Sequence, residues 1–232
     1  EWIHALEEGA GARWMRWSVF LLGLVALATL YNFRAFRHFS SPEAMDAAQI
    51  ARNLAEGKGF TTDFIRPVSL FYLKQKQGDA KLREAHPDLA NAPLYPWLLS
   101  GWMRIGGFAF EIGDASGFEA YQPEERIGWF NQFWLILAIV GTWVLARKLF
   151  DPYVAWVSAA ILAGTDVLWR YSLSGLSTCL LVFLMVLLAL VLVAAERRSG
   201  DDGYSLIRLG GLALLAGVVT GALGLTRYGM GW

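Results

Sequence analysis

The chain has 232 residues and no net formal charge, and 56% of its residues are hydrophobic while only 17% are charged. This composition is unusual for a soluble domain and is typical of a polytopic membrane protein. The balanced charge provides no general basic field for nucleic acid. The single cysteine, Cys179, excludes a disulfide framework and a cysteine-ligated zinc site.

The first predicted helix is the apolar segment 17–33, which follows an N-terminal segment, residues 1–16, that is acidic and then basic. About 17–25 apolar residues are enough to cross a bilayer as a helix. Because no convincing small-residue cleavage site follows the apolar run, we expect a retained transmembrane helix rather than a signal peptide.

A short amphipathic helix is predicted near residues 41–56. One of two serines can cap its N-terminus, Pro42 suits its first position, and a glycine ends it. At 100° per residue, two alanines, Ile50 and Leu54 share one side, while polar residues such as Asp46 and Asn53 share the other. We therefore expect a helix on the membrane surface whose polar side faces water.

Two acids, Glu43 and Asp46, stand at the beginning of this helix. Acids in a first helical turn are stabilised by the helix dipole by about 0.3–1 kcal/mol. A surface helix also needs polar residues on its water-facing side. Helix chemistry alone therefore accounts for both acids without any catalytic role.

The segment 93–110 is apolar but contains two prolines, a Gly-Gly pair and Arg104. Positive residues of short loops prefer the cytoplasm. If this segment does not span the membrane, three basic clusters fall on the same side: Arg13 with Arg16, Arg147 with Lys148, and Arg197 with Arg198. We therefore expect a cytoplasmic N-terminus and a long external loop, 34–126, with an interfacial or re-entrant helix near 94–105. A short sixth span is the alternative.

Four further apolar segments complete the predicted fold: 127–146, 152–169, 171–195 and 209–226, with a cytoplasmic loop at 196–208. Asp166 lies late in the second of these segments, four residues before Arg170, which favours a structural ion pair at a helix end. The predicted fold class is an all-α polytopic membrane protein. It has about five transmembrane helices and two external juxtamembrane helices in the first loop.

Four stretches of sequence follow one another in a recognisable order. They are the acidic pair followed by ARNLAEGKGF, the proline-rich APLYPWLL, RYSLSGLSTCLLVFLMVLLAL, and GALGLTRYGMGW. Together they resemble the GT-C superfamily of integral-membrane glycosyltransferases, which use polyprenyl-phosphate sugars. The resemblance covers residues 17–232 and implies a first external loop with two juxtamembrane helices, in agreement with the charge pattern.

The resemblance implies transfer of a sugar from a polyprenyl-phosphate donor to an acceptor hydroxyl at the external face. Either Glu43 or Asp46 would be the general base, which must come within about 2.6–3.2 Å of the hydroxyl. The departing lipid phosphate needs a cation, because negative charge grows on it. Arg227 matches the arginine of the LTR stretch, and Arg52 and Arg66 are further candidates.

The pattern requires no cofactor. If a divalent metal takes part, the two acids would offer oxygen ligands suited to Mg²⁺ or Mn²⁺. In AHPDLANAPLYP, His86 and Asp88 are candidates for an acceptor site, and Tyr95 is a candidate for stacking on a sugar. Each candidate also has a structural interpretation: a packed loop histidine, an interfacial tyrosine anchor, or, for Arg227, an arginine that reaches the interface.

Two features depart from the family pattern. Ser177 stands where the family often has glutamate, and the sequence reaches Trp232 soon after LTRYG, where family members continue with further spans. The resemblance therefore implies the N-terminal part of such an enzyme or a shortened relative. The alternative is a non-catalytic GT-C-like subunit whose glycine-rich helices allow close packing in a larger membrane complex.

The expected partners are the lipid bilayer, a polyprenyl-phosphate sugar and other membrane subunits, but not nucleic acid. The implied location is the inner (plasma) membrane of a bacterium, with the N-terminus in the cytoplasm. A transporter is a weaker alternative, since it predicts paired inverted repeats and broken helices, and no such paired set is evident in the sequence.

Overall fold

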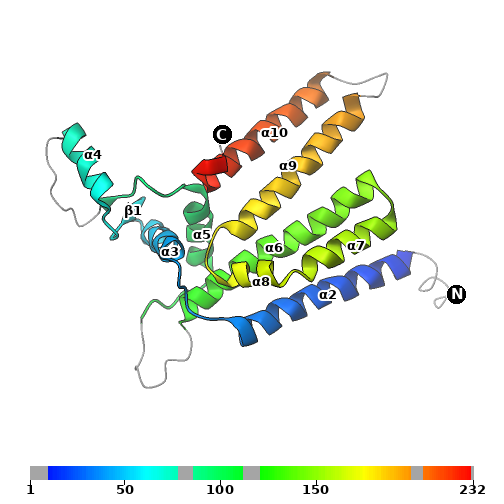
Figure 1. The fold of residues 1–232 in the computed structure, drawn as a ribbon, viewed down its shortest axis with the longest axis horizontal. Coiled ribbons are helices and arrows are strands. Elements are labelled where there is room, and N and C mark those ends of the chain that lie inside the picture. Colours follow the sequence, from blue (N-terminus) through cyan, green and yellow to red (C-terminus); the bar gives the residue numbers. More distant parts are fainter. Residues whose placement is uncertain (1–9, 78–85, 112–120, 200–205, 231–232) are drawn as a thin grey trace. The chain divides into compact units, whose positions relative to one another are not determined.

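The computed structural model describes four parts of the chain, residues 10–77, 86–111, 121–199 and 206–230 (Figure 1). The protein is an all-α polytopic membrane protein, as the composition predicts. The chain divides into two units, Glu1–Phe36 and Arg37–Trp232. Parts of the predicted segments 1–16 and 196–208 lie outside the described residues.

The described part of the first unit is one helix, α2 (Ala10–Ala35). It contains the predicted segment 17–33 and is long and apolar enough to cross a membrane. Two polar side chains near its end donate hydrogen bonds to backbone carbonyls of the same helix. The Thr29 hydroxyl donates to the Val25 carbonyl at 2.9 Å, and the Asn32 amide donates to the Ala28 carbonyl at 3.0 Å. Such internal bonds are what a helix in lipid requires.

The described part of the second unit contains helices and one short pair of strands. Its elements are α3 (Pro42–Ala55), β1 (Thr61–Thr62), α4 (Pro67–Gln77), β2 (His86–Pro87), α5 (Leu94–Ile105), α6 (Gln122–Leu149), α7 (Pro152–Ala163), α8 (Asp166–Leu173), α9 (Thr178–Ser199), α10 (Leu206–Thr226) and the 3₁₀ helix η2 (Tyr228–Met230). The two strands pair in antiparallel fashion, with Thr62 opposite His86. The sequence pattern predicts neither α4 nor this strand pair.

Among the described residues, α2, α6, α9 and α10 are each long and apolar enough to cross a membrane, and the pair α7 and α8 would add a fifth span. This pair is bent by 51°, although the sequence predicts one helix over 152–169. The break comes at Gly164, which ends α7, and Thr165, whose extended backbone precedes α8. Consequently α9 begins at Thr178 rather than at the predicted residue 171.

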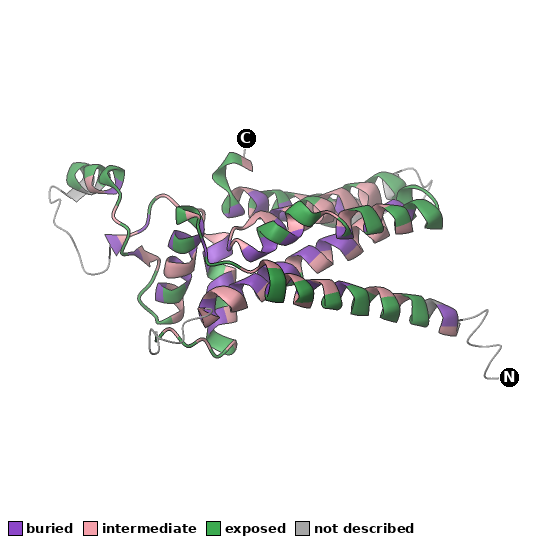
Figure 2. Ribbon diagram, turned by 60° about the horizontal axis from the view of Figure 1, so that its bottom comes forward, coloured by how far each residue is buried: buried purple, intermediate pink, exposed green. Residues whose placement is uncertain are grey.

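The second unit packs around α6, which contacts α7, α8 and α9, while α9 also packs against α10 (Figure 1). A Cβ at Gly141 of α6 would lie 2.9 Å from Cγ1 of Val186 in α9, so glycine permits this close approach. Leu135 and Ile139 of α6 are fully buried. Much of the surface of α10 is exposed (Figure 2), as expected for side chains that face lipid.

The short helices α3 and α5 pack against each other and build the core next to the candidate site. Ala47 and Ala51 of α3 are buried with Tyr95 and Leu99 of α5. The expectation that the polar side of α3 faces water is wrong for Asp46, which is only 2% exposed, and for Asn53, which is 5% exposed. The loop that contains β1 covers this side of the helix, and the Asn53 amide donates to the Thr61 carbonyl at 2.9 Å.

Candidate functional site

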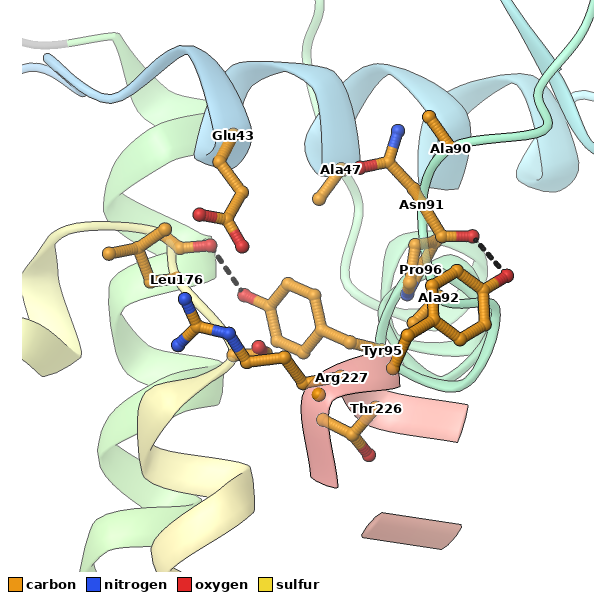
Figure 3. Close-up of a pocket in the computed structure, with 14 residues that line it drawn as sticks. Glu43, Ala47, Ala90, Asn91, Ala92, Tyr95, Pro96, Leu176, Thr226 and Arg227 are labelled. Carbon is orange, nitrogen blue, oxygen red and sulfur yellow. Dashed lines mark hydrogen bonds between the residues drawn. The ribbon is translucent and has the colours of Figure 1, made fainter. Parts of the chain in front are cut away.

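A cavity of about 230 Å³ opens where α3, α5, the loop between α8 and α9, and the end of α10 meet (Figure 3). Its lining comes from each of the four stretches that carry the family resemblance. The lining residues are Glu43, Ala47, Ala90, Asn91, Ala92, Tyr95, Pro96, Gly175, Leu176, Ser177, Thr226, Arg227, Tyr228 and Gly229. Segments that are far apart in the sequence therefore converge on one site, which is called the motif cavity here.

The start of α3 reaches the motif cavity because the preceding loop is tied to α6. The Glu124 carboxylate accepts a hydrogen bond from the Phe39 backbone N–H at 3.2 Å and lies 2.9 Å from His38 Nδ1. Ser41 has the extended backbone of a helix N-cap, but its side chain makes no capping bond. Pro42 and Glu43 then form the first turn of α3, so the Glu43 carboxylate lies at the edge of the cavity.

The loop between α8 and α9 approaches α3 through a glycine. Gly175 has a φ of 76°, in the left-handed region that favours glycine, and a Cβ there would lie 2.5 Å from the Phe39 ring. Any side chain at this position would push the loop away from Phe39, which lies in the segment that precedes α3. Ser177 follows in the cavity wall, directly before the first residue of α9, at the position where the family often has glutamate.

Tyr95 is buried and holds the same loop from the side of α5. Its hydroxyl lies 2.9 Å from the Gly175 carbonyl and 3.1 Å from Oδ1 of Asn131 in α6. One hydroxyl hydrogen cannot serve both acceptors, and the Asn131 Nδ2 has no partner among the described residues. With the Asn131 amide turned by 180°, its N–H₂ donates to Tyr95, and Tyr95 donates to Gly175. Burial raises the pKa of Tyr95, so the phenol stays neutral and remains a donor.

Glu43 and Arg227 point into the motif cavity from opposite sides (Figure 3). Both side chains are exposed, and neither makes an ion pair or hydrogen bond to the described part of the chain. Arg227 stands where α10 ends, since its own N–H still donates to the Leu223 carbonyl at 3.0 Å. The cavity thus presents a free carboxylate and a free guanidinium to whatever occupies it.

Asp46 lies one turn after Glu43 but does not line the motif cavity. It is 2% exposed and accepts hydrogen bonds from three side chains. The donors are Arg66 Nη2 at 2.6 Å, Asn91 Nδ2 at 2.9 Å and Thr62 Oγ1 at 3.1 Å. Because its carboxylate oxygens are already occupied, Asp46 is a structural centre for the surrounding loops.

The loop before α5 is held in the cavity wall through Asn91. The Asn91 N–H donates to the Asp88 carboxylate at 2.8 Å, its amide donates to Asp46, and its carbonyl accepts from the Tyr228 hydroxyl at 3.1 Å. Asp88 is therefore used in a turn rather than in the cavity lining. His86 is also outside the lining and is 1% exposed. Neither of its ring nitrogens has a hydrogen-bond partner among the described residues.

The other predicted cations lie away from the motif cavity. Arg66 is paired with Asp46. Arg52 Nε lies 2.8 Å from Glu56 Oε1, and the Arg52 guanidinium carbon lies 4.4 Å from the centre of the Phe110 ring. Hydrogen bonds from Lys58 and Arg52 lower the pKa of Glu56, which therefore stays ionised. Arg52 thus has a structural role at the end of α3.

The predicted use of Glu43 and Asp46 as ligands of Mg²⁺ or Mn²⁺ does not fit the arrangement of the residues. Asp46 is committed to three donors. Within residues 10–77, 86–111, 121–199 and 206–230, no group of three or more His, Cys, Asp or Glu side chains is placed to hold a metal ion.

Of the residues predicted from the sequence, the structure brings Glu43, Tyr95 and Arg227 together. It also adds Asn91 and Tyr228, which no sequence pattern singled out, although Tyr228 lies inside one motif stretch and Asn91 directly precedes another. Scans against models of protein families, against curated proteins and against solved structures find no match for this chain.

Proposed function

We propose that the protein is a GT-C-like membrane glycosyltransferase that moves a sugar from a polyprenyl-phosphate donor to an acceptor hydroxyl. One observation carries this proposal: the four stretches that resemble the family meet at one cavity, where an unpaired carboxylate faces an unpaired guanidinium (Figure 3). A base for the acceptor and a cation for the departing phosphate are the two groups that this reaction needs.

In the proposed reaction, the acceptor oxygen attacks the anomeric carbon and a new carbon–oxygen bond forms. The bond between the anomeric carbon and the phosphate oxygen breaks, and its electron pair leaves with the lipid phosphate. Glu43 takes the proton of the acceptor hydroxyl, while Arg227 stabilises the charge that grows on the phosphate. Glu43 suits the base role better than Asp46 because the Asp46 oxygens already accept three hydrogen bonds.

The proposed topology places the motif cavity at the external face of an inner (plasma) membrane and the N-terminus in the cytoplasm. The positions of basic residues support this orientation. The first residue of α9 follows the cavity residue Ser177, and the helix contains Arg197 near its other end. Similarly, α6 begins near the acids of its first turn and ends with Arg147 and Lys148. Both helices thus end with the basic residues that prefer the cytoplasm.

The test compares two acids that both lie in a first helical turn. Membranes that contain the full chain are supplied with a panel of polyprenyl-phosphate hexoses and pentoses. The rate of sugar transfer is measured as the amount of polyprenyl phosphate released over time. We expect Glu43→Gln to lower the rate by about 100-fold or more. The matched control is Glu125→Gln in α6, outside the cavity lining, which should keep the wild-type rate. An unchanged rate in Glu43→Gln would remove Glu43 as the base.

Arg227→Gln tests the other half of the site. We expect weaker binding of polyprenyl phosphate, measured without any sugar, while Glu43→Gln should bind this lipid as the wild type does. The two variants together separate donor binding from proton transfer. If neither variant changes binding or transfer, the motif cavity is not the active site.

A second candidate function, a non-catalytic subunit of a membrane complex, is favoured by the surface of α10. A Cβ at Gly217 or Gly221 would meet no atom within 4 Å in the described structure, so this GxxxG pair is open to a neighbouring helix. This alternative predicts stable co-purification with another membrane chain and loss of that partner in Gly217→Leu. It also predicts no binding of polyprenyl phosphate, which is the result that distinguishes it from the enzyme.

A further inference from the structure

A larger hollow, about 630 Å³, lies between α5 and α6 and shares no residue with the motif cavity. Four of its six lining residues are aromatic, and one is charged. The lining residues are Trp102, Gly106, Arg126, Trp129, Phe130 and Phe133. This hollow is called the aromatic groove here.

One stripe of α6 forms most of the aromatic groove. Arg126, Trp129, Phe130 and Phe133 follow the spacing of three, four and seven residues that places side chains on one side of a helix. Trp129 is partly buried, and Phe133 is 53% exposed. The groove therefore opens outward from the unit.

The opposite wall belongs to α5 and is held against α6. The Trp102 indole N–H donates to the Arg126 carbonyl at 3.2 Å, and the Trp102 ring stacks on Phe130 with 6.3 Å between ring centres. A Cβ at Gly106 would lie 2.8 Å from the Phe108 ring, so glycine lets the chain turn back at the end of the groove. These contacts build the walls before any ligand arrives.

Arg126 places a positive charge at one end of the groove. Its guanidinium carbon lies 5.8 Å from the centre of the Phe108 ring, and it makes no ion pair with any described carboxylate. The nearby acid Glu124 is occupied by His38 and by the Phe39 N–H. Arg126 also directly precedes the apolar run 127–146, where α6 enters the membrane. Arginine and tryptophan at this depth are typical of the headgroup region.

We propose that the aromatic groove binds a phospholipid of net negative charge, with its phosphate on Arg126 and part of an acyl chain along Trp129 and Phe133. The unpaired guanidinium selects a phosphate group, and the aromatic walls select a hydrocarbon chain. A groove at the membrane boundary meets lipid before any other ligand. The site is distinct from the donor site proposed above, where the phosphate is bound by Arg227.

The experiment counts the lipids that remain bound to the full chain in native mass spectrometry, with phosphatidylglycerol and phosphatidylcholine titrated separately. We expect the wild type to retain phosphatidylglycerol preferentially. Arg126→Gln should weaken phosphatidylglycerol binding about tenfold, because a charge-assisted hydrogen bond is lost. The matched control is Arg147→Gln at the other end of α6, which is exposed and outside the groove. It should bind phosphatidylglycerol as the wild type does.

A second variant tests the apolar part of the site. Phe133→Ala removes a half-exposed ring with little expected effect on folding, and it should weaken binding of long-chain phosphatidylglycerol more than that of a short-chain form. Wild-type binding in both Arg126→Gln and Phe133→Ala would overturn the proposal. An equal loss of phosphatidylglycerol binding in Arg147→Gln would also overturn it. So would a wild-type protein that retains polyprenyl phosphate through Arg126 but does not retain phosphatidylglycerol.

Discussion

Helix α3 carries two acids about one turn apart, and one of them is exposed while the other is buried. Glu43 is exposed at the motif cavity and has no partner among the described side chains. Asp46 is buried under the loop with β1 and accepts three hydrogen bonds. Acid type and spacing alone therefore do not assign a role to either carboxylate. What matters is whether the carboxylate oxygens are free or already occupied.

The two acids also differ in what they contribute to the fold. The Asp46 side of α3 joins α3, β1, the beginning of α4 and the loop before α5 through one buried carboxylate. The Glu43 side is an open surface over alanines and Tyr95, where charge is held ready for a ligand. A functional site often contains such unsatisfied charge, while the neighbouring network keeps the walls in place.

The largest effect on stability is expected for Asp46→Ala. Removing this carboxylate leaves the Asn91 amide, the Thr62 hydroxyl and the partly exposed Arg66 without their acceptor, and we expect a loss of about 2–4 kcal/mol. Thermal unfolding in detergent would measure it. The control is Asp63→Asn, where an exposed acid accepts one bond from Gln49, and a small change is expected. Similar losses in both variants would contradict the structural role of Asp46.

Gly175→Ala should have the next largest effect. The new Cβ meets the Phe39 ring, and alanine is strained at a φ of 76°, so we expect a loss of about 2 kcal/mol or more. Unlike Asp46→Ala, this change acts directly on the motif cavity, because Gly175 lines it. Gly210→Ala is the control, since a Cβ there meets no described atom within 4 Å. Gly175→Ala should weaken donor binding and lower the unfolding temperature, whereas Gly210→Ala should leave both unchanged.

Tyr95→Phe should cost about 1–2 kcal/mol, since it removes the bond to the Gly175 carbonyl and leaves Asn131 unsatisfied. The raised pKa of Tyr95 adds a pH dependence. Below the ordinary tyrosine pKa of about 10, the phenol is neutral in both folded and unfolded chains. Above it, the unfolded phenol loses its proton first, so stability falls as pH rises. The free energy of unfolding should therefore fall less steeply above pH 10 in Tyr95→Phe than in the wild type, as measured by unfolding at several pH values.

The smallest effect on stability is expected for Glu43→Gln, which removes only a favourable interaction with the helix dipole, worth about 0.3–1 kcal/mol. Its effect on sugar transfer is expected to be large. In Asp46→Ala, by contrast, the main expected effect is a loss of stability. A large loss of stability in Glu43→Gln, with transfer unchanged in the protein that remains folded, would show that the two acids do not differ as proposed.

Much of the fold could be predicted from the sequence, because apolar length and period are local properties. The apolar segments 17–33, 127–146 and 209–226 each lie inside an observed helix, and short helices occur near 41–56 and 94–105. The break at Gly164 and Thr165 was not predicted, since the apolar residues continue through it. The helix α4 was also missed. It is short and polar near its end, with no apolar pattern to reveal it.

The candidate site was predicted only in part for a related reason. Glu43, Tyr95 and Arg227 were found through the motif stretches, and the structure brings them to one cavity. Nothing in the sequence distinguishes Glu43 from Asp46, because both are acids in or near a first turn. Asn91 and Tyr228 were missed because their hydrogen bond joins residues far apart in the chain.

The amino-acid sequence is sufficient to predict a helical membrane protein and the stretches that contain candidate residues. The hydrophobic effect acts on each apolar segment separately, so length and composition are enough for that conclusion. The packed fold is needed to show which acid is free, which arginines are already paired, and that four distant stretches share a cavity. These properties depend on contacts between segments far apart in the chain, where burial and hydrogen bonding occupy some polar groups and leave others open.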